Sequence, residues 1–268
     1  MSVLSPPVAV VTGGSSGIGL ETALALKARG CRVYEFSRHG KDTPGVAHVD
    51  CDVSDETKVQ DAVHAVREEA GRIDILVNNA GFGISGAAEF TDNAQAKKLL
   101  DVNLFGMVNC CKAVIPILRE QGGGRIVNLS SVAAPCAIPF QAWYSVSKSA
   151  VSTYSAALGN ELRPFGISVT AVLPGDIRTG FTAAREKNPA GDGVYGGRIA
   201  RSVAVMEHDE RTGMDPAAAG RYIAKIALKP GAVKPEYAIG FKYKFFVLLA
   251  RLLPCGLKNW IIGKMYGG

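Results

Sequence analysis

The sequence predicts an α/β protein, in which one domain holds a doubly wound parallel sheet with helices on both faces. Three observations lead to this fold class. Short apolar runs alternate with stretches of helical periodicity along the chain. A glycine-rich segment joins the first apolar run to the first helical stretch. The 268 residues contain no Gly/Ser-rich linker and no internal repeat, so we expect a single domain over 1–268.

The elements follow from apolar runs and turn residues. Gly30 is expected to end the first helix, because glycine accepts the left-handed backbone common there. Ser54 or Asp55 is expected to cap the second helix. We expect strands at 8–12, 31–36, within 45–53, and at 72–81, 124–131, 167–175 and 237–240. We expect helices at 20–30, 55–70, 94–120 and 142–163.

Two segments depart from this alternation. Residues 178–213 are rich in glycine, arginine and polar residues, and an insertion of this kind at the carboxyl edge of a sheet is typical of a substrate loop or lid. Residues 241–268 form a basic, apolar tail in which aromatic residues, leucines and lysines mix. Two interpretations of the tail stay open: contact with a membrane surface, or docking on the domain or a partner subunit.

Composition and charge exclude several classes of protein. Apolar residues make up 47% and charged residues 20%, as in a globular chain with a sizeable core. The tail supplies +5 of the net charge of +6, so we expect no broad nucleic-acid-binding face. The six cysteines form no CxxC pair and no metal-ligand spacing, so we expect a reduced chain without a metal site.

Targeting signals are not evident in the sequence. The N-terminus lacks a basic stretch followed by a long apolar run, and no run reaches ~18 apolar residues. We therefore expect a cytoplasmic protein, with peripheral membrane contact through 241–268 left open.

The segment TGGSSGIG at 12–19 has the features of a phosphate-binding loop. It lies between the first strand and the first helix, where glycine lets the backbone approach a pyrophosphate and the helix N-terminus presents free N–H groups. The two serines add hydroxyl donors. We expect the dinucleotide to contact Gly13, Ser15, Ser16, Gly17, Ile18 and Gly19.

The end of the second strand indicates which dinucleotide binds. An acid there suits the ribose of NAD, whereas a basic residue suits the 2′-phosphate of NADP. Ser37 stands at the position of that acid and Arg38 follows it, so we expect NADP(H) as cofactor. Glu35 should point to the opposite side of the strand from Phe36. Asp52 and Val53, after the third strand, are expected at the adenine, although Asp52 is equally compatible with a cap.

The stretch YSVSK places Tyr144 and Lys148 one helical turn apart on one face. A free tyrosine has a pKa of ~10 and exchanges protons poorly at neutral pH. The ammonium of Lys148 and the positive ring of an oxidised nicotinamide would lower that pKa. Tyr144 would then give a proton to a carbonyl oxygen or take one from an alcohol, while Lys148 holds the ribose.

Two further side chains are candidates for the same centre. Ser130 and Ser131 end the fifth strand on opposite faces, so only one of them faces the site, where it would orient the substrate oxygen. Asn103 interrupts an apolar helix, and its buried amide needs partners. We expect a water chain from Asn103 to Lys148.

Taken together, TGGSSGIG, NNAG at 78–81, the set Asn103, Ser131, Tyr144 and Lys148, and PG at 174–175 resemble the short-chain dehydrogenase/reductase family. The resemblance runs from about residue 8 to 240. It implies a Rossmann-type sheet of about seven parallel strands, hydride transfer with a nicotinamide, and Ser131 as the catalytic serine. It also implies a homodimer or homotetramer formed through the helices at 94–120 and 142–163. The further cofactor contacts that it implies are Asn79, Ala80, Gly81, Pro174, Gly175, Ile177 and Thr179.

The substrate is expected to be lipophilic. The residues expected to line its pocket are Val132, Ala133, Cys136, Ile138, Phe140 and residues of the insertion, which are mostly apolar. A softer resemblance to hydroxysteroid and retinol dehydrogenases favours a steroid- or retinoid-like alcohol or ketone. The alternatives are a 3-oxoacyl thioester or sugar-type carbonyl, a dinucleotide-sensing protein without turnover, and a serine hydrolase. The last is disfavoured because no G-x-S-x-G segment is present.

Overall fold

The computed structural model describes residues 6–40 and 43–267, and it confirms the expected fold class. Seven parallel strands form the sheet, in the order β3-β2-β1-β4-β6-β7-β9. The order runs outward in both directions from the neighbouring pair β1 and β4, as in a doubly wound sheet. The strands are β1 (Val8–Thr12), β2 (Arg32–Ser37), β3 (Val46–Asp50), β4 (Ile75–Asn78), β6 (Gly124–Leu129), β7 (Ile167–Leu173) and β9 (Glu236–Ala238).

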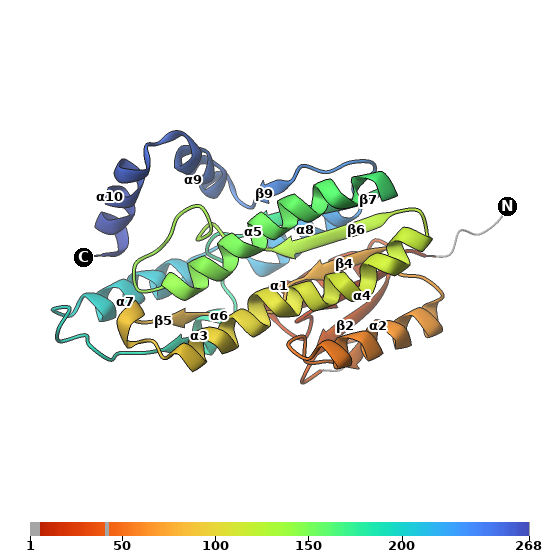
Figure 1. Ribbon diagram of the computed structural model, residues 1–268, viewed down its shortest axis with the longest axis horizontal. Helices are drawn as coiled ribbons and strands as arrows, with labels where there is room; N and C mark the ends of the chain where they lie inside the picture. Colours follow the sequence, from red (N-terminus) through yellow and green to blue (C-terminus); the bar gives the residue numbers. More distant parts are fainter. Residues whose placement is uncertain (1–5, 41–42, 268) are drawn as a thin grey trace.

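Helices cover both faces of the sheet (Figure 1). Helices α2 (Glu56–Ala70), α4 (Gly106–Glu120) and α5 (Ala142–Leu162) share one buried apolar cluster with the strands. Helices α1 (Gly17–Lys27) and α8 (Pro216–Ala227) share a second cluster on the opposite face. The sequence-based prediction lacked α8. Because both faces are covered, the strands are nearly continuous apolar runs rather than alternating ones.

The helix expected over 94–120 is interrupted. The structure has α3 (Asn93–Leu100), then a π-helical turn at Asp101–Phe105, then α4. The π turn contains Asn103 at its centre. A period-based prediction does not detect one extra residue per turn, so the sequence indicated a single helix. Asn93–Glu120 is long and apolar enough to cross a membrane by length and composition, and α4 uses part of that apolar surface to pack on the sheet.

The insertion at 178–213 is folded rather than an extended loop. It contains α6 (Phe181–Ala184), β8 (Glu186–Lys187) and α7 (Arg198–Arg211). Strand β8 pairs in parallel with β5 (Ile84–Ser85), which follows β4. Lys98 Nζ donates to Glu186 Oε1 at 2.7 Å and ties the same segment to α3. The insertion is therefore attached to the body close to the carboxyl ends of the strands.

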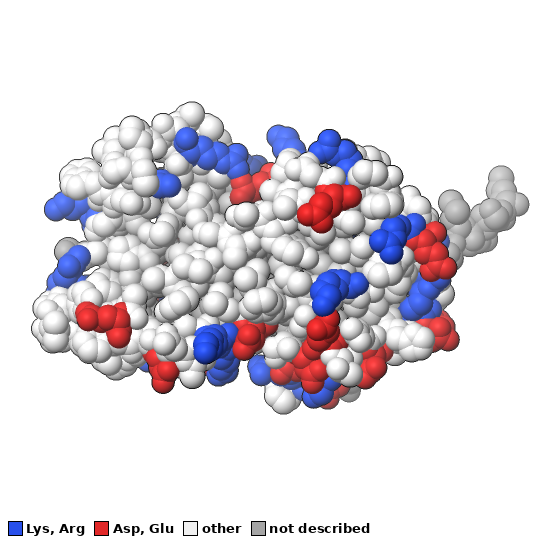
Figure 2. Space-filling view, in the orientation of Figure 1, with Lys and Arg blue, Asp and Glu red and all other residues white. Residues whose placement is uncertain are grey.

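The tail forms two helices, α9 (Phe241–Leu252) and α10 (Cys255–Tyr266), which meet at Pro254. Figure 1 shows them beyond β9, at the same end of the molecule as α7. Val247 joins Ala171 and Leu173 in a small apolar cluster, so α9 docks on the end of β7. Figure 2 shows this end of the molecule as largely uncharged surface with scattered Lys and Arg atoms.

Candidate active site

A cleft of about 590 Å³ lies at the carboxyl ends of the strands. Its lining comes from the loops after β1, β2, β4, β6 and β7, together with α5, α6, α7 and α10. The cleft lies where the strand order reverses, which is the usual ligand site of an open α/β sheet. Every residue expected at the cofactor or the catalytic centre lines this cleft except Gly19 and Asn103. Those two lie directly behind its wall.

The glycine loop joins β1 to α1 with the backbone that its sequence requires. Gly13 and Gly17 have φ of 63° and 54°, a region that side chains rarely adopt. A Cβ on Gly19 would overlap the carbonyl oxygen of Gly13 and the amide of Asn79. The helix N-terminus can therefore come close to the loop only because residue 19 is glycine. Gly17 and Ile18, the first residues of that helix, line the cleft, and a helix N-terminus there suits a diphosphate.

Thr12 holds the loop against the segment after β4, a role that sequence reasoning missed. Its buried Oγ1 accepts hydrogen bonds from the backbone N–H groups of Asn79 and Ala80, at 2.9 and 3.0 Å. In return, Asn79 Nδ2 donates to the carbonyls of Thr12 and Gly13, at 3.0 and 3.1 Å. A threonine at the end of an apolar strand is an ordinary strand residue, so the sequence carried no separate signal for this contact.

We expect Gly19→Ala to weaken both folding and dinucleotide binding. The added methyl group would overlap backbone, which costs about 1–3 kcal/mol of unfolding free energy when a packed site is overfilled. Denaturant unfolding and NADPH titration measure the two effects. Gly180→Ala is the matched control, because a Cβ there meets no atom within 4 Å and the residue also lines the cleft. Equal stability of the two variants would contradict the packing argument.

The end of the cleft beside β2 carries an exposed cation. Arg38 is exposed and lines the cleft beside Ser37. Glu35 points away, as expected: it is buried, its Oε1 accepts from Ser37 Oγ at 3.2 Å, and it lies 2.5 Å from His48 Nδ1. The carboxylate nearest the loop is thus directed into the protein, while the guanidinium stays at the cleft.

Asp52 lies at the cleft and also caps a turn, and its expected contact with the adenine stays a prediction. It lines the cleft, and its Oδ1 also accepts from Ser54 N and Ser54 Oγ, at 3.0 and 2.7 Å. Burial acts to raise the pKa of Asp52, but the bonds from Ser54 and the charges of Arg38 and Lys58 outweigh it and lower the pKa. Asp55 is the side chain that caps α2, through Thr57 N and Lys58 N.

Tyr144 and Lys148 lie on α5, with the Lys148 Nζ 5.7 Å from the centre of the Tyr144 ring. Lys148 is buried and donates to the carbonyl of Leu129 at 2.8 Å. Burial lowers the pKa of Lys148 to about 8. Burial also raises the pKa of Tyr144 to about 12, although its hydrogen bond with Ser131 acts in the opposite direction. The lowering that the sequence predicted is therefore not produced by the protein's own groups, because desolvation of the phenol outweighs the hydrogen bond with Ser131 and the charge of Arg185.

The two serines after β6 face different ways. Ser130 Oγ donates to the backbone carbonyl of Lys148 at 2.8 Å and lies 2.8 Å from Ser152 Oγ, so it fastens β6 to α5. Ser131 Oγ accepts from Ala133 N at 3.1 Å, and both Ser131 and Tyr144 line the cleft. The alternation along the strand thus places Ser131 beside the phenol.

Asn103 has hydrogen-bond partners within the protein, and the expected water chain to Lys148 stays a prediction. Its Oδ1 accepts from Phe82 N and its Nδ2 donates to Phe82 O, both at 2.9 Å, and Nδ2 also contacts Ser147 Oγ at 3.2 Å. A Cβ on Gly81 would lie 2.9 Å from Asn103 Oδ1 and 3.7 Å from Lys148 Nζ. The amide therefore holds the segment after β4 against α5, close to the lysine.

The substrate end of the cleft is less uniformly apolar than the sequence indicated. Of the expected lining, Val132, Ala133 and Ile138 are present, whereas Cys136 and Phe140 are not. Phe140 packs edge-on against Tyr195 instead, with ring centres 5.5 Å apart. The insertion contributes the apolar residues Phe181, Ala184 and Met206 and the acids Glu186 and Glu210.

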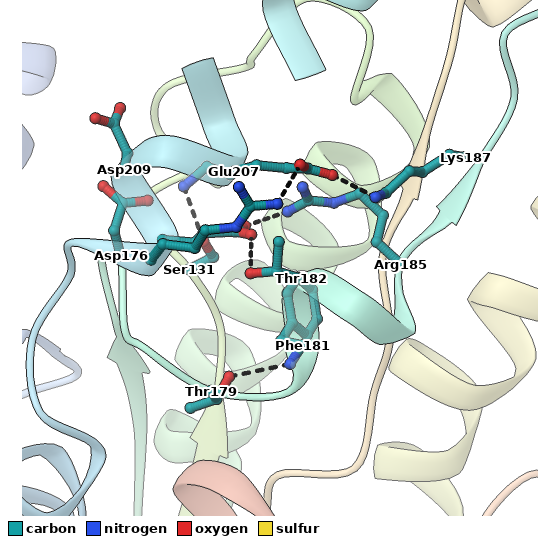
Figure 3. Close-up of polar contacts among 12 residues, drawn as sticks. Ser131, Asp176, Thr179, Phe181, Thr182, Arg185, Lys187, Glu207 and Asp209 are labelled. Carbon is teal, nitrogen blue, oxygen red and sulfur yellow. Dashed lines mark hydrogen bonds and ion pairs between the residues drawn. The ribbon is translucent and has the colours of Figure 1, made fainter. Parts of the chain in front are cut away.

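Figure 3 shows polar side chains at this end of the cleft, among them Asp176, Thr182 and Arg185. We call these residues, together with Glu210, the polar wall. Glu210 accepts from Thr182 Oγ1 at 2.6 Å and pairs with the buried Arg185. Asp176, the residue after Pro174 and Gly175, lines the cleft, and its Oδ2 accepts from Tyr243 OH at 2.6 Å. Burial raises the pKa of Asp176, and the nearby charges of Asp209 and Glu210 raise it further.

The tail also reaches the cleft, which sequence reasoning missed. Tyr266 of α10 lines it, and its hydroxyl lies 3.4 Å from Asp209 Oδ2 on α7. The contact between Tyr266 and Asp209 joins residues 57 apart in the sequence, and no local pattern marks it. Within residues 6–40 and 43–267, no group of His, Cys, Asp and Glu is arranged to hold a metal ion.

Comparisons with known proteins find similar sequences and a similar structure. A family model described as short chain dehydrogenase matches residues 7–190. The 3-ketodihydrosphingosine reductase of Bacteroides thetaiotaomicron is 40% identical over 229 residues, 84% of this chain and 85% of that one. The 3-oxoacyl-(acyl-carrier-protein) reductase of Synechocystis sp. is 35% identical over 70% of this chain and 81% of its own. A solved short-chain dehydrogenase from Streptomyces avermitilis superposes with a TM-score of 0.80 at 30% identity, covering 91% and 92% of the two chains.

Proposed function

We propose that this chain, which belongs to the short-chain dehydrogenase/reductase family, interconverts a lipophilic ketone and its secondary alcohol with NADP(H). The chain is an oxidoreductase of that family, whose members use a nicotinamide dinucleotide. The single observation that supports the proposal best is that Tyr144, Lys148 and Ser131 line the same cleft as the glycine loop. A dinucleotide-sensing protein needs no such acid–base group.

In the proposed mechanism the cofactor supplies or accepts the hydride, and the side chains handle the proton. Ser131 donates a hydrogen bond that orients the substrate oxygen. With a pKa of about 12 in the protein, Tyr144 keeps its proton at neutral pH and can donate it to the oxygen of a ketone under reduction. Lys148, held by Leu129 O, is placed to bind the ribose and to counter charge on the phenol.

We expect kcat/KM for ketone reduction to fall as the pH rises through about 8. Lys148 loses its proton there, and with it the positive charge that favours ribose binding and a phenolate on Tyr144. Initial rates from pH 6 to pH 10, at saturating NADPH and low ketone, give the profile. Lys148→Arg keeps a cation at all these pH values, so it should lose the alkaline limb even if its maximum rate is lower. A wild-type profile that stays flat well above pH 8 would contradict the assignment.

The preference for NADP(H) is supported by the charges at the end of β2. Arg38 is exposed at the cleft, and within the described parts of the chain no ion pair engages it. A phosphate on the adenosine ribose would find a bidentate donor there. Glu35, the acid that could repel such a phosphate, is held inside by Ser37 and His48.

The proposed substrate has an apolar body and a polar group near its carbonyl. Phe181, Ala184 and Met206 suit the apolar body, whereas Asp176 and Glu210 suit a hydroxyl or amine that donates hydrogen bonds. The relative named 3-ketodihydrosphingosine reductase makes that ketone a candidate. The 3-oxoacyl reductase among the relatives makes a 3-oxoacyl thioester the second candidate. The carboxylates of Asp176 and Glu210 disfavour a substrate that carries negative charge near its carbonyl.

A substrate screen tests the proposal. NADPH and NADH oxidation would be followed with 3-ketodihydrosphingosine, steroid and retinoid carbonyls, 3-oxoacyl thioesters and sugars. We expect the highest kcat/KM for NADPH with a lipophilic ketone that carries a hydrogen-bond donor. Binding of NADPH without turnover of any carbonyl would support the sensing alternative, and preference for the thioester would support the second candidate.

We also propose a homodimer or homotetramer through α4 and α5. Phe105, at the start of α4, and Val146 of α5 are large apolar side chains exposed on these two helices. Covering them would bury apolar surface that the single chain leaves in water.

A further inference from the structure

The outer surface of α9 carries a continuous apolar row. Phe241, Phe245, Leu248 and Leu252 are separated by four, three and four residues, so they lie on one face of the helix. All four are exposed, with Phe241 90% and Leu252 71% accessible. On α10, Leu257 and Trp260 are also exposed, and Trp260 is 61% accessible. We call these six residues the tail face.

The opposite side of the same two helices is fixed to the body. Val247 is buried against the end of β7, and Ile262 is buried on α10. Tyr243 donates to Asp176, and a Cβ on Gly175 would overlap its ring. Arg198 Nε donates to the carbonyl of Gly267 at 2.5 Å. The tail face is therefore the outer surface of a docked pair of helices rather than a core that has failed to close.

All the charged side chains of the two tail helices are positive. The segment 241–268 contains Lys242, Lys244, Arg251, Lys258 and Lys264, and no acid. Arg251 pairs with Glu236, and the other four make no ion pair within the described residues. Figure 2 shows blue atoms around the surface formed by α9 and α10. Exposed aromatic and leucine side chains next to unpaired lysines are typical of helices that lie in a lipid interface.

We propose that the tail face binds the surface of an anionic lipid bilayer. Charge selects this partner over a second copy of the chain. A twofold contact through the tail face would bring the same lysines of two subunits together, and like charges repel. Anionic headgroups would neutralise those lysines while the apolar side chains enter the acyl boundary.

Binding in this orientation would place the cleft close to the lipid. Tyr266 on α10 lines the cleft, and Tyr243 on α9 contacts Asp176 at its substrate end. A lipophilic ketone dissolved in the bilayer could then reach the cleft without crossing bulk water. This step rests on the proposed function, whereas binding of the tail face to lipid does not.

The full chain can be tested by co-sedimentation with vesicles. We expect it to pellet with vesicles of equal parts phosphatidylcholine and phosphatidylglycerol, and much less with phosphatidylcholine alone. High salt should release part of it. In a Trp143→Phe background the single tryptophan, Trp260, should shift its emission to shorter wavelength on binding. No binding to the anionic vesicles, or no response of Trp260, would overturn the proposal.

Two pairs of substitutions locate the contact. Phe245→Glu with Trp260→Glu should lower the vesicle partition coefficient at least about tenfold, because two apolar side chains become charged. Lys258→Glu with Lys264→Glu should lower it at least about twentyfold, since each cation near an anionic surface contributes about fivefold.

Matched controls change the same residue types elsewhere. Phe165→Glu with Val194→Glu alters two other exposed apolar residues, and Lys225→Glu with Lys229→Glu alters two exposed lysines outside the tail. Both control variants should bind vesicles as the wild type does. All four double variants should retain NADPH binding. Equal losses in the controls would overturn the assignment to the tail face.

Sedimentation velocity separates the competing partner. The wild type could form a dimer that dissociates in the variant Phe245→Glu with Trp260→Glu, and show no binding to vesicles. That result would assign the tail face to a second copy and overturn the proposal. Failure of the proposed function would give a different result. The chain would bind vesicles, but none of the ketones tested would cause it to oxidise NADPH.

Discussion

Tyr144→Phe is expected to lower kcat for ketone reduction about a thousandfold, within the 10²- to 10⁴-fold range of a general acid. The substitution removes only the hydroxyl that bonds to Ser131 and leaves the ring against Phe181, with ring centres 5.6 Å apart. Folding and NADPH binding should therefore change little. Initial rates with the best ketone of the screen, and a fluorescence titration of NADPH, measure the two quantities.

Tyr154→Phe is the control for this result. Tyr154 lies on the same helix but packs partly buried against the core rather than in the cleft. Its loss should change kcat less than about twofold, as for a side chain outside the reacting centre. Activity of Tyr144→Phe within tenfold of the wild type would show that another group supplies the proton.

Arg38→Leu is expected to weaken NADPH binding about 10- to 100-fold and to leave NADH binding nearly unchanged. Two charge-assisted hydrogen bonds to the 2′-phosphate would be lost, and NADH has no phosphate at that place. Because the side chain is exposed and in no ion pair within the described residues, its removal should not disturb folding. The measurement is the Kd of each dinucleotide by titration.

Arg32→Leu provides the comparison for Arg38→Leu. Arg32 begins the same strand β2, at the end away from the cleft, and pairs with Glu69 on the surface. It should leave both Kd values unchanged. Parallel losses for NADPH and NADH in Arg38→Leu would mean that Arg38 contacts the shared adenosine rather than the 2′-phosphate.

The polar wall of the cleft connects the insertion, the strand ends and the tail. Glu210 is on α7, Asp176 follows β7, and Tyr243 and Tyr266 come from α9 and α10. Arg185, buried and paired with Glu210, fastens α6 to α7 and lies 5.6 Å from the centre of the Phe181 ring. Substrate specificity would then depend on how α7, the end of β7, α9 and α10 pack together, not on the insertion alone.

The sequence by itself determined the features that arise from local physics. Apolar runs and helical spacing located β1, β2, β4, β6 and β7, and the glycine loop was recognisable because a tight approach of backbone permits only glycine. The i to i+4 spacing placed Tyr144 and Lys148 on one face of α5, and strand alternation separated Ser130 from Ser131. Each of these inferences uses neighbours within a few residues of each other.

Tertiary structure decided everything that depends on distant segments. The π turn around Asn103, the contacts of Thr12 with Asn79, and the carboxylates of Asp176 and Glu210 at the cleft all arise from packing between elements. The pKa of Tyr144 is raised rather than lowered because burial, which no sequence pattern measures, outweighs the hydrogen bond with Ser131 and the charge of Arg185. The tail was predicted to be either interfacial or docked. Its helices are docked along one face and leave the other exposed, because only the folded body determines which side of an amphipathic helix is covered.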